Sequence, residues 1–333
     1  MKYTQQGIAI TGCGSATPKQ ILSNEDLSQM VDTSDEWIKT RTGISTRHLA
    51  SLDNSLSQLG AKAASQALSM AGLEASEIDL IVLATSTADD LFGSACQIQS
   101  LLGASRAVAF DLTAACSGFV FGLITVAQFI RMGVYRNVLL IGGDILSRWV
   151  DWSDRNSCVL FGDGAGAVVC QATESRDGLL GFEMCSDGNY NSFLNLAYQP
   201  QSKSLVHEVS IAQGGYEFIT MNGREVYRFA VAKVPEVIEK ALYRAELGTD
   251  DVDWLILHQA NQRIMDAVAS RLNIPDEKVI SNVANYGNTS AASIPLALNE
   301  AVRNGKIQPG NIIAISGFGA GLTWGAAIFQ WGN

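Results

Sequence analysis

The sequence has few basic residues, few histidines and no long apolar run. Its 23 lysines and arginines are outnumbered by 33 aspartates and glutamates, which gives a formal net charge of −10. This balance argues against a general nucleic-acid-binding protein, although it leaves room for a local basic patch. No stretch approaches the ~18 apolar residues of a membrane span, and the first residues do not resemble a signal peptide. We therefore expect a cytoplasmic protein that binds neither nucleic acid nor membrane.

The six cysteines are scattered along the chain. They lie at Cys13, Cys96, Cys116, Cys158, Cys170 and Cys185, without a Cys-x-x-Cys pair and without a histidine–cysteine group at zinc spacing. This pattern is typical of a reducing compartment, and it predicts that the protein holds no metal.

An internal repeat divides the chain into two similar parts. Residues 73–85 resemble residues 247–259, and residues 137–143 resemble residues 311–317, with the same offset in both cases (247 − 73 = 174; 311 − 137 = 174). Two segments that match at one offset indicate a tandem duplication. Repeats are also common in binding proteins, so the duplication does not by itself indicate catalysis.

Strand and helix patterns alternate in both parts. Helices are predicted at 55–71, 95–102, 117–132, 226–245, 261–272 and 291–304, and short strands at 107–112 and 279–283. Strands that alternate with helices favour parallel pairing through crossover connections. We therefore predict an α/β protein of two βαβαβ halves, 1–180 and 181–333, packed as layers around a pseudo-twofold axis. The 47% hydrophobic content of the 333 residues is enough for a substantial core.

Cys116 lies where a buried-strand pattern ends and an apolar helix pattern begins. Free backbone N–H groups and the positive end of a helix favour a thiolate, so a lowered pKa is expected for this thiol. The same N–H groups suit a developing oxyanion. The alternative is a buried structural cysteine, the commoner role of a lone cysteine in apolar surroundings.

Two further polar side chains are predicted at the same edge of the fold. His258 closes the strand pattern 254–258, and the alternative for it is a hydrogen-bonded, half-buried histidine. The offset of 174 moves position 116 to 290, inside the loop that holds Asn288, which is otherwise a simple turn residue. Ligands gather at the carboxyl ends of parallel strands. Cys116, His258 and Asn288 are therefore expected to form one nucleophilic site.

Two glycine-rich runs follow or precede predicted strands. The run 316–325 follows the last repeat strand and either completes an oxyanion hole or forms a glycine turn. The run 161–167 leads into a strand pattern, whereas a dinucleotide-binding fingerprint leads into a helix, so that function is excluded.

Taken together, the motifs resemble the β-ketoacyl-acyl-carrier-protein synthase III family of the thiolase superfamily. They are Asp35–Ile38 with Thr40–Gly43, Ala114–Gly118, Phe161–Gly166, His258–Asn261, Gly287–Ser290, and Gly317–Gly321 with Thr323–Gly325. The resemblance covers essentially the whole chain. It implies a thiolase-like fold of five layers (αβαβα), a homodimer, and no cofactor, since a coenzyme A thioester is the substrate.

The resemblance also implies a reaction that starts fatty acid synthesis. Cys116 would attack a short acyl-CoA, with acetyl-CoA as the default, while the backbone N–H groups of Cys116 and Ala320 hold the alkoxide. Malonyl-carrier protein would follow, and His258 and Asn288 would donate hydrogen bonds to its thioester oxygen during decarboxylation. The family usually has glycine where Ala320 stands, and we expect function to be kept unless that position needs a positive φ.

Three groups of binding residues follow from the same resemblance. They are Trp37, Arg41, Thr42, Arg155 and Asn261 for coenzyme A, Arg228 and Arg263 for the carrier protein, and Leu91 and Phe92 for the acyl pocket across a dimer interface. The alternatives are a core aromatic for Trp37, a solvated helix face for the two arginines, and plain interface packing for Leu91 and Phe92.

Other activities of related enzymes fit the sequence less well or stay open. Thiolases need a second cysteine near the C-terminus, and none follows Cys185; elongating synthases have a second histidine where this chain has Asn288. Polyketide and alkyl-quinolone-type synthases that use coenzyme A share the Cys-His-Asn set and stay open as alternatives. Papain-like hydrolases have the same residue order but a different local cysteine signature. A non-catalytic carrier-binding homologue would be expected to have lost one of the three residues.

Overall fold

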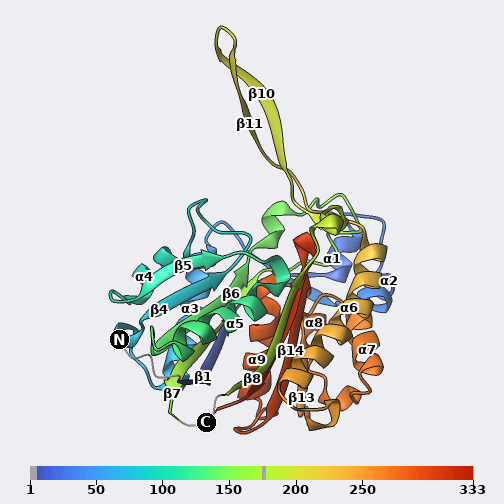
Figure 1. Cartoon of the computed structure of the whole chain (residues 1–333). Coiled ribbons are helices and arrows are strands. Elements are labelled where there is room, and N and C mark those ends of the chain that lie inside the picture. Colours follow the sequence, from blue (N-terminus) through green and yellow to red (C-terminus); the bar gives the residue numbers. More distant parts are fainter. Residues whose placement is uncertain (1–5, 175–177, 333) are drawn as a thin grey trace.

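The computed structural model describes residues 6–174 and 178–332, and its centre is a pair of stacked β-sheets (Figure 1). The first sheet has the strand order β1-β7-β6-β4-β5. Its strands are β1 (Gly7–Ala16), β4 (Leu80–Ala84), β5 (Val108–Leu112), β6 (Asn137–Asp144) and β7 (Gly164–Thr173). The second sheet has the order β13-β14-β15-β8. Its strands are β8 (Leu179–Ser186), β13 (Trp254–Leu257), β14 (Ile312–Gly319) and β15 (Thr323–Gln330).

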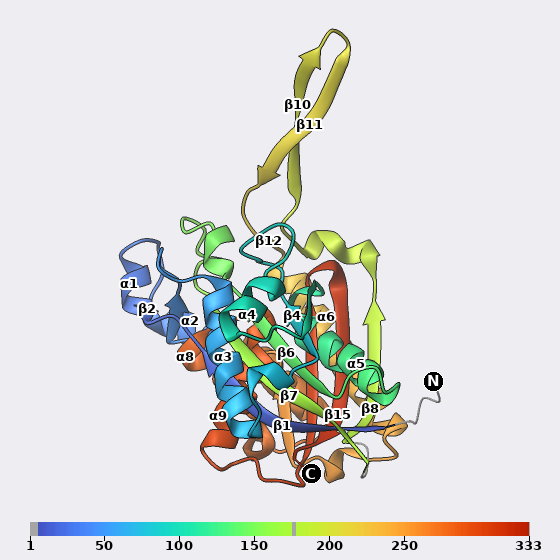
Figure 2. The same ribbon diagram turned by 90° about the vertical axis from the view of Figure 1, so that its left-hand side faces the viewer.

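Helices lie outside and between the two sheets (Figures 1 and 2). α3 (Leu56–Ala71) and α4 (Ala95–Leu102) cover the outer face of the first sheet, and α6 (Gly223–Arg244) and α7 (Gln262–Arg271) cover the outer face of the second. α5 (Gly118–Arg131) and α9 (Ser293–Arg303) pack between the sheets in a shared apolar core. This arrangement confirms the predicted five-layered fold.

Side-chain alternation along the strands separates the apolar cores. In β6, Leu140 points into the central core between the sheets, while Leu139 and Ile141 point to the outer core under α3. Successive residues of a strand face opposite sides, so one short apolar run can serve two layers. Both faces of the sheet are therefore buried, as a continuous apolar run predicts.

α3 shows how local sequence determines an element and its packing. Ser55 caps the helix and forms a capping box with Gln58, and Gly72 ends it with a φ of 67°. Gly12 on β1 lets the helix approach closely, because a Cβ at that position would lie 2.2 Å from the carbonyl oxygen of Ala67. The predicted helix at 55–71 is confirmed.

The two halves are similar but not identical. β4, β5 and β6 are parallel, as predicted, whereas β1, β7, β8 and β15 add antiparallel pairs. The predicted strand at 279–283 is wrong: this segment makes only a bridge from Val279 to Leu255 and runs into α8 (Val283–Tyr286). The Gln259 side chain bonds to the backbone of Ile280 and Asn282, which takes the place of a strand ladder.

The offset between the halves also changes along the chain. Asp79 and Asp253 are equivalent at an offset of 174, and each carboxylate accepts a hydrogen bond from the first residue of the neighbouring strand. Those first residues are Asn137 and Ile312, which are 175 apart (312 − 137 = 175). The offset between equivalent residues is therefore 174 at the first parallel strand of each half and 175 at the strand beside it, whereas the sequence predicted 174 for both.

Smaller elements surround the carboxyl ends of the parallel strands. They are β2 (Gln20–Ser23), α1 (Asn24–Ser28), α2 (Asp35–Thr42), β3 (Thr46–Leu49), β9 (Leu194–Asn195) and β12 (Thr220–Met221). A hairpin of β10 (Tyr198–Val206) and β11 (Val209–Tyr216) projects far from the body (Figures 1 and 2). Its base contacts the body through Tyr216, whose ring packs edge-on against Trp149. None of the described helices has the length and apolarity needed to cross a membrane.

Candidate active site

Cys116 lies in a single turn of 3₁₀ helix, Ala115–Ser117, between β5 and α5. The thiol is buried, and the end of β14 from the other half of the chain lies against its backbone. A Cβ at Gly319 would lie only 2.6 Å from the backbone nitrogen of Cys116, and a Cβ at Gly317 would lie 3.1 Å from its carbonyl oxygen. The glycine run predicted to approach a ligand closely therefore also approaches the nucleophile.

The predicted lowering of the Cys116 pKa is not found. Burial raises the pKa of the thiol to about 12, the hydrogen bond from Ser290 acts in the opposite direction, and the negative charge of Asp144 adds to the rise. Cys116 precedes α5, which begins at Gly118, so the positive end of that helix does not outweigh the loss of water around the sulfur. In the free protein the thiol is protonated and needs a base.

His258 follows β13 and is held by the second half of the chain. Its backbone N–H donates to the carbonyl of Ser316 over 2.8 Å, and its ring packs edge-on against Phe318 at 5.4 Å between centroids. The side chain is 1% exposed, and burial lowers the pKa of the imidazole to about 3. The ring is therefore neutral at physiological pH.

Ser293 is the hydrogen-bond partner of the His258 ring at Nδ1. Its Oγ lies 2.8 Å from Nδ1 of His258 and accepts a hydrogen bond from the backbone N–H of Gln259 over 3.3 Å. The hydroxyl proton of Ser293 can be donated to Nδ1, which then acts as the acceptor. In that tautomer the proton of the neutral ring is on Nε2, where it can be donated to a substrate oxygen.

Asn288 is held on both sides by the first half of the chain. Its backbone N–H donates to Leu160 over 2.8 Å, and its carbonyl accepts from Gly162 over 3.0 Å. The side-chain Oδ1 accepts from the backbone of Ser290 over 2.9 Å. The amide Nδ2 is therefore the group that Asn288 can offer to a ligand. The run 161–167 supports Asn288 and then enters β7, as its sequence predicted.

Ser290 begins a turn, Ser290–Ala292, that packs against the thiol turn and against β6, and it was not predicted as a site residue. Its side chain acts to lower the pKa of Cys116 and that of Asp144, although burial raises both pKa values overall. Ser290 and Ala115 both have a positive φ, 51° and 47°, and they are equivalent in the two halves at an offset of 175 (290 − 115 = 175). The offset of 174 thus indicated the correct loop but the wrong partner, because Ala291 is the equivalent of Cys116.

Ala320 follows β14 in a short turn, Ala320–Leu322. The positive φ values of this turn belong to Gly321 and Leu322, at 73° and 42°. An alanine at position 320 therefore meets no left-handed strain, and its backbone N–H is as usable as that of glycine.

Trp37 on α2 is half-buried between two arginines. The guanidinium carbons of Arg41 and Arg155 lie 5.7 and 5.4 Å from its ring centroid. Arg155 also donates to the backbone carbonyl of Asp32 over 2.9 Å. A flat base held between Trp37 and Arg155 would stack on both groups, which would then have to lie about 7 Å apart. The present separation is 5.4 Å, so Arg155 has to move outward to admit such a base.

Thr42 and Asn261 have structural contacts of their own. The buried Thr42 hydroxyl donates to Ile38 and accepts from Ile44 at the end of α2. Asn261 caps α7, and its Nδ2 donates to the carbonyl of Arg41 over 3.0 Å. The two residues therefore hold α2 and α7 in place beside Trp37.

Arg228 and Arg263 are exposed on α6 and α7. Arg228 pairs with Glu225 over 2.9 Å, and the guanidinium of Arg263 lies 5.8 Å from the ring centroid of Tyr227. Tyr227 adjoins Arg228 in the sequence, so the two cations are near each other on the surface.

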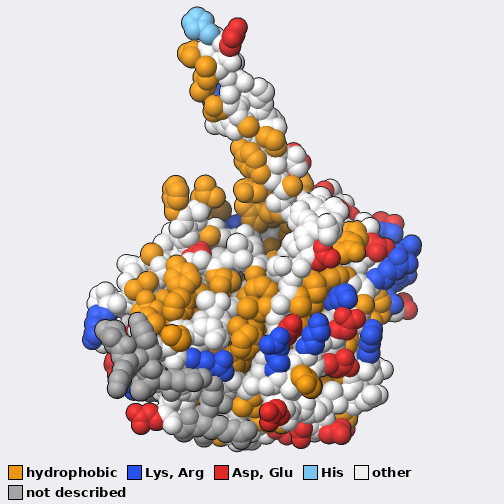
Figure 3. Space-filling model, in the orientation of Figure 1, with side chains coloured by type: hydrophobic (Ala, Val, Ile, Leu, Met, Phe, Trp, Pro, Cys, Tyr) orange, Lys and Arg blue, Asp and Glu red, His pale blue; other side chains and the backbone are white. Residues whose placement is uncertain are grey.

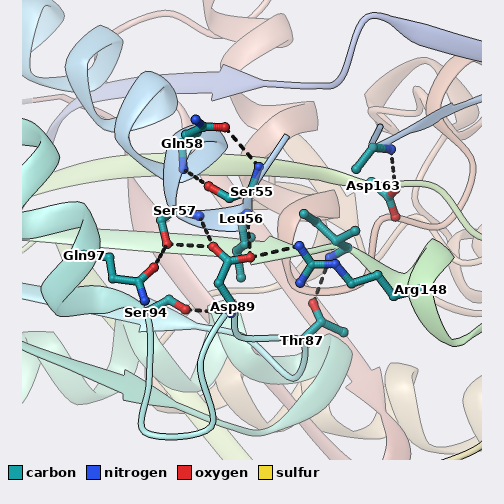
Figure 4. Close-up of polar contacts among 12 residues, drawn as sticks. Ser55, Leu56, Ser57, Gln58, Thr87, Asp89, Ser94, Gln97, Arg148 and Asp163 are labelled. Carbon is teal, nitrogen blue, oxygen red and sulfur yellow. Dashed lines mark hydrogen bonds and ion pairs between the residues drawn. The ribbon is translucent and has the colours of Figure 1, made fainter. Parts of the chain in front are cut away.

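Leu91 and Phe92 are 87% and 97% exposed, whereas Cys116 is buried. Their loop is anchored by Asp89, as Figure 4 shows: the carboxylate accepts from the backbone of Leu56 and Ser57 at the start of α3 and pairs with Arg148 over 2.9 Å. Burial acts to raise the pKa of Asp89, but the hydrogen bonds from Ser57 and Arg148 lower it overall.

A surface hollow of about 550 Å³ opens beside Arg148. A second, of about 350 Å³, lies between Arg131 and Arg244. Neither is lined by Cys116, His258 or Asn288. Within residues 6–174 and 178–332, no group of three or more His, Cys, Asp or Glu side chains is placed to hold a metal ion.

Comparison with known proteins identifies the family. A family model described as 3-oxoacyl-[acyl-carrier-protein] synthase III matches residues 110–188, and the model for its C-terminal part matches residues 242–331. The chain is 71% identical to the β-ketoacyl-[acyl-carrier-protein] synthase III of Nostoc sp. over 98% of this chain and 99% of that one. It is 69% identical to that of Microcystis aeruginosa over 98% of both chains.

Solved structures agree with the sequence comparison. The 3-oxoacyl-[acyl-carrier-protein] synthase III of Aquifex aeolicus is 43% identical, with a TM-score of 0.90 over 98% of this chain and 100% of that one. A priming β-ketosynthase from a polyketide pathway is 32% identical, with a TM-score of 0.89 over 100% and 98%. The chain thus belongs to the β-ketoacyl-[acyl-carrier-protein] synthase III family, whose members are acyl-transferring condensing enzymes.

Proposed function

We propose that this protein is a β-ketoacyl-acyl-carrier-protein synthase III that condenses a short acyl-CoA with malonyl-carrier protein. The observation that carries the proposal is that two elements of the second half pack against the thiol turn Ala115–Ser117: strand β14, which bonds to the backbone of His258, and the turn Ser290–Ala292, which follows Asn288. Cys116 supplies the thiol, and the proposed donors are Nε2 of His258 and Nδ2 of Asn288. A site with one nucleophile and two neutral donors suits transfer of an acyl group followed by formation of an enolate.

The first half-reaction transfers the acyl group to the protein. Cys116 loses its proton and attacks the thioester carbonyl, and the developing oxyanion receives the backbone N–H groups of Cys116 and Ala320. The close approach of Gly319 to Cys116 supports this pairing, since it brings the start of the Ala320 turn beside the thiol. The C–S bond to coenzyme A then breaks, and the coenzyme leaves as its thiol.

The second half-reaction joins two carbons. Nε2–H of His258 and Nδ2–H of Asn288 donate to the thioester oxygen of the bound malonyl group, so carbon dioxide leaves and an enolate forms. The enolate carbon attacks the acyl-cysteine, Cys116 leaves as a thiolate that takes up a proton, and a 3-oxoacyl-carrier protein is released. His258 needs to gain no proton, which agrees with its lowered pKa.

The remaining predicted roles belong to this proposal. Trp37, Arg41 and Arg155 hold the adenine end of coenzyme A, with Thr42 and Asn261 positioning that region. Arg228 and Arg263 meet the acidic carrier protein. Six free cysteines support a reducing, cytoplasmic setting.

We also propose that two copies associate, with Leu91 and Phe92 of one copy capping the acyl pocket of the other. β5 is an edge strand of the first sheet, and Leu91 and Phe92 expose a large apolar area nearby. Further apolar side chains lie exposed along the hairpin (Figure 3), among them Leu205, Val206, Val209 and Ile211. Sedimentation of F92D should show monomers where the wild type and Y243D, an exposed change on α6, show dimers; a monomeric wild type would overturn this part.

Two measurements test the function: the intact mass of the protein after acylation, and the malonyl thioester that it needs for condensation. Intact mass after incubation with acetyl-CoA should show one acetyl group on the wild type and on C96S, which changes an exposed cysteine, but none on C116S. Persistent acetylation of C116S would overturn the nucleophile. Condensation should require malonyl-carrier protein.

The similarity to a priming polyketide synthase makes a CoA-using condensing enzyme the second candidate. Efficient use of malonyl-CoA alone would favour it, and hydrolysis of acetyl-CoA without condensation would favour a thioester hydrolase. A comparison of kcat/KM for acetyl-, isobutyryl- and octanoyl-CoA then determines the acyl preference.

A further inference from the structure

Glu300 on α9 is a half-buried carboxylate with no role in the mechanism above. Its Oε1 accepts from the Tyr286 hydroxyl over 2.5 Å, and its Oε2 accepts from Nδ2 of Asn282 over 2.8 Å. Burial and the hydrogen bond to Glu300 raise the pKa of Tyr286, so the phenol stays protonated and is the donor. Asn282 is the N-cap of α8 and Tyr286 is its last residue. One carboxylate therefore ties both ends of α8 to α9.

Tyr286 is separated from the proposed donor Asn288 by a single glycine. Gly287 has a φ of 65° and a ψ of −157°, a conformation that is essentially restricted to glycine. Glycine is conformationally permissive and gives the backbone little stiffness of its own. The direction in which the chain enters Asn288 therefore depends on the groups that hold Tyr286.

The ring of Tyr286 is held on a second side by the first half of the chain. It stacks on His48 of β3, with 5.2 Å between the ring centroids and 26° between the ring planes. The His48 carbonyl accepts from the backbone N–H of Asp163 over 2.8 Å. The neighbouring Gly162 donates to the carbonyl of Asn288 over 3.0 Å. The ring of Tyr286 and the backbone of Asn288 therefore rest on one connected part of the first half.

Asn282 connects the same carboxylate to the surroundings of His258. Its backbone N–H donates to Oε1 of Gln259 over 2.9 Å, and Gln259 directly follows His258. The backbone N–H of Gln259 donates to Ser293 Oγ, which also contacts the His258 ring. Ser293 and Glu300 are two helical turns apart (300 − 293 = 7), so they lie on the same side of α9. One face of α9 therefore contacts the support of each proposed donor.

We propose that Glu300 and Tyr286 are positioning residues that aim the Asn288 amide at the malonyl thioester oxygen. Glu300 fixes the phenol, the phenol fixes the chain ahead of Gly287, and the orientation of Nδ2 of Asn288 follows. The inference rests on the proposed function in taking Asn288 as a donor for decarboxylation. The acylation step is independent of Glu300, because that step uses backbone donors alone.

The proposal predicts a loss in one half-reaction only. E300A and Y286F should each lower kcat for decarboxylation of malonyl-carrier protein about tenfold, because a displaced donor stabilises the enolate less. KM should stay within about twofold of the wild type, since the carrier protein binds elsewhere. Acetylation of Cys116 by acetyl-CoA, measured by intact mass, should also stay within about twofold. A residue needed only for folding would lower both half-reactions together with the folded fraction.

Two matched variants separate positioning from stability. E300Q keeps both contacts, because its amide oxygen can accept from Asn282 and its amide nitrogen can donate to the Tyr286 hydroxyl, so decarboxylation should return to within about threefold of the wild type. N299A removes a buried amide of the same helix that bonds to Ser15 over 2.7 Å, and both half-reactions should stay within about twofold. Unchanged decarboxylation in E300A and Y286F would overturn the proposal, as would an equal loss in N299A.

Hydrogen exchange tests the positioning without the reaction. In E300A, peptides that cover residues 282–288 should exchange their backbone hydrogens about tenfold faster than in the wild type and in N299A. Unchanged exchange in E300A would count against the support of α8 by Glu300. If E300A fails to fold, as judged by circular dichroism, Y286F decides.

The two proposals fail in different ways. A wild type that does not decarboxylate malonyl-carrier protein would refute the function, and the exchange of E300A would still decide whether Glu300 holds the segment before Asn288. Decarboxylation by the wild type and equally by E300A and Y286F would retain the function and refute the positioning role.

Discussion

Replacement of Ser293 by alanine tests the assignment of the His258 proton to Nε2. The hydroxyl of Ser293 is 1% exposed and lies 2.8 Å from Nδ1, so its removal leaves that nitrogen buried without its donor. A buried hydrogen bond of this kind contributes about 1 kcal/mol, and about 1.4 kcal/mol corresponds to a tenfold change in rate. Because Nε2–H is used only when the malonyl group decarboxylates, S293A should lower decarboxylation about five- to tenfold.

The assay separates the two half-reactions of the same protein. Release of carbon dioxide from malonyl-carrier protein reports on the His258 donor, and intact mass after incubation with acetyl-CoA reports on Cys116. S293A should impair the former and leave acetylation of Cys116 within about twofold of the wild type. S293T, which keeps a hydroxyl at the start of α9, should restore decarboxylation. Equal loss of both activities, or unchanged decarboxylation, would refute the proposed role of Ser293.

Three further predictions concern the glycine approach, the buried imidazole and the surface arginines. G319A places a methyl group 2.6 Å from the backbone nitrogen of Cys116, so urea denaturation should show a loss of about 1–3 kcal/mol in the free energy of unfolding, and acetylation should be lost. The control A320G adds no atoms and should stay near the wild type. A fully acetylated G319A would contradict the contact. Burial lowers the pKa of folded His258 to about 3, so the unfolded state binds protons more strongly than the folded state. The free energy of unfolding should therefore fall by up to about 1.4 kcal/mol per pH unit as the pH drops below 6.5 towards 3. If the stability of H258N fell as much as that of the wild type in the same denaturation series, the cause would not be His258. R263E should lose activity with malonyl-carrier protein in a salt-sensitive way, whereas K203E, a charge change on the distant hairpin, should not; unchanged kinetics of R263E would remove the docking role.

Much of the fold could be predicted from local signals. The helix at 95–102 has the predicted ends, and the helix predicted at 55–71 begins one residue later, at Leu56, because Ser55 is its cap. Capping residues and glycine stops act within one turn of the chain, so their effect can be inferred from neighbouring residues. The placement of Cys116 between a strand and a helix was predictable for the same reason.

Other features depended on contacts between distant segments. The strand predicted at 279–283 is replaced by bonds to the Gln259 side chain, about twenty residues away. The one-residue change of offset became visible only through the paired contacts of Asp79 and Asp253. No local pattern indicated that β10 and β11 would extend from the body, because their exposed residues pack against little of the chain.

The sequence by itself determined which residues could do chemistry here: the thiol, the imidazole and the amide, each at the end of a predicted strand or loop. The tertiary structure decided how those groups are protonated. Burial depends on the atoms that surround a group from all directions, and it raises the pKa of Cys116 and lowers that of His258. Only the packing of the two halves could bring the turn Ser290–Ala292 against the thiol turn Ala115–Ser117, since the two turns are far apart in the chain. The nucleophile was therefore predictable, and its protonation state was not.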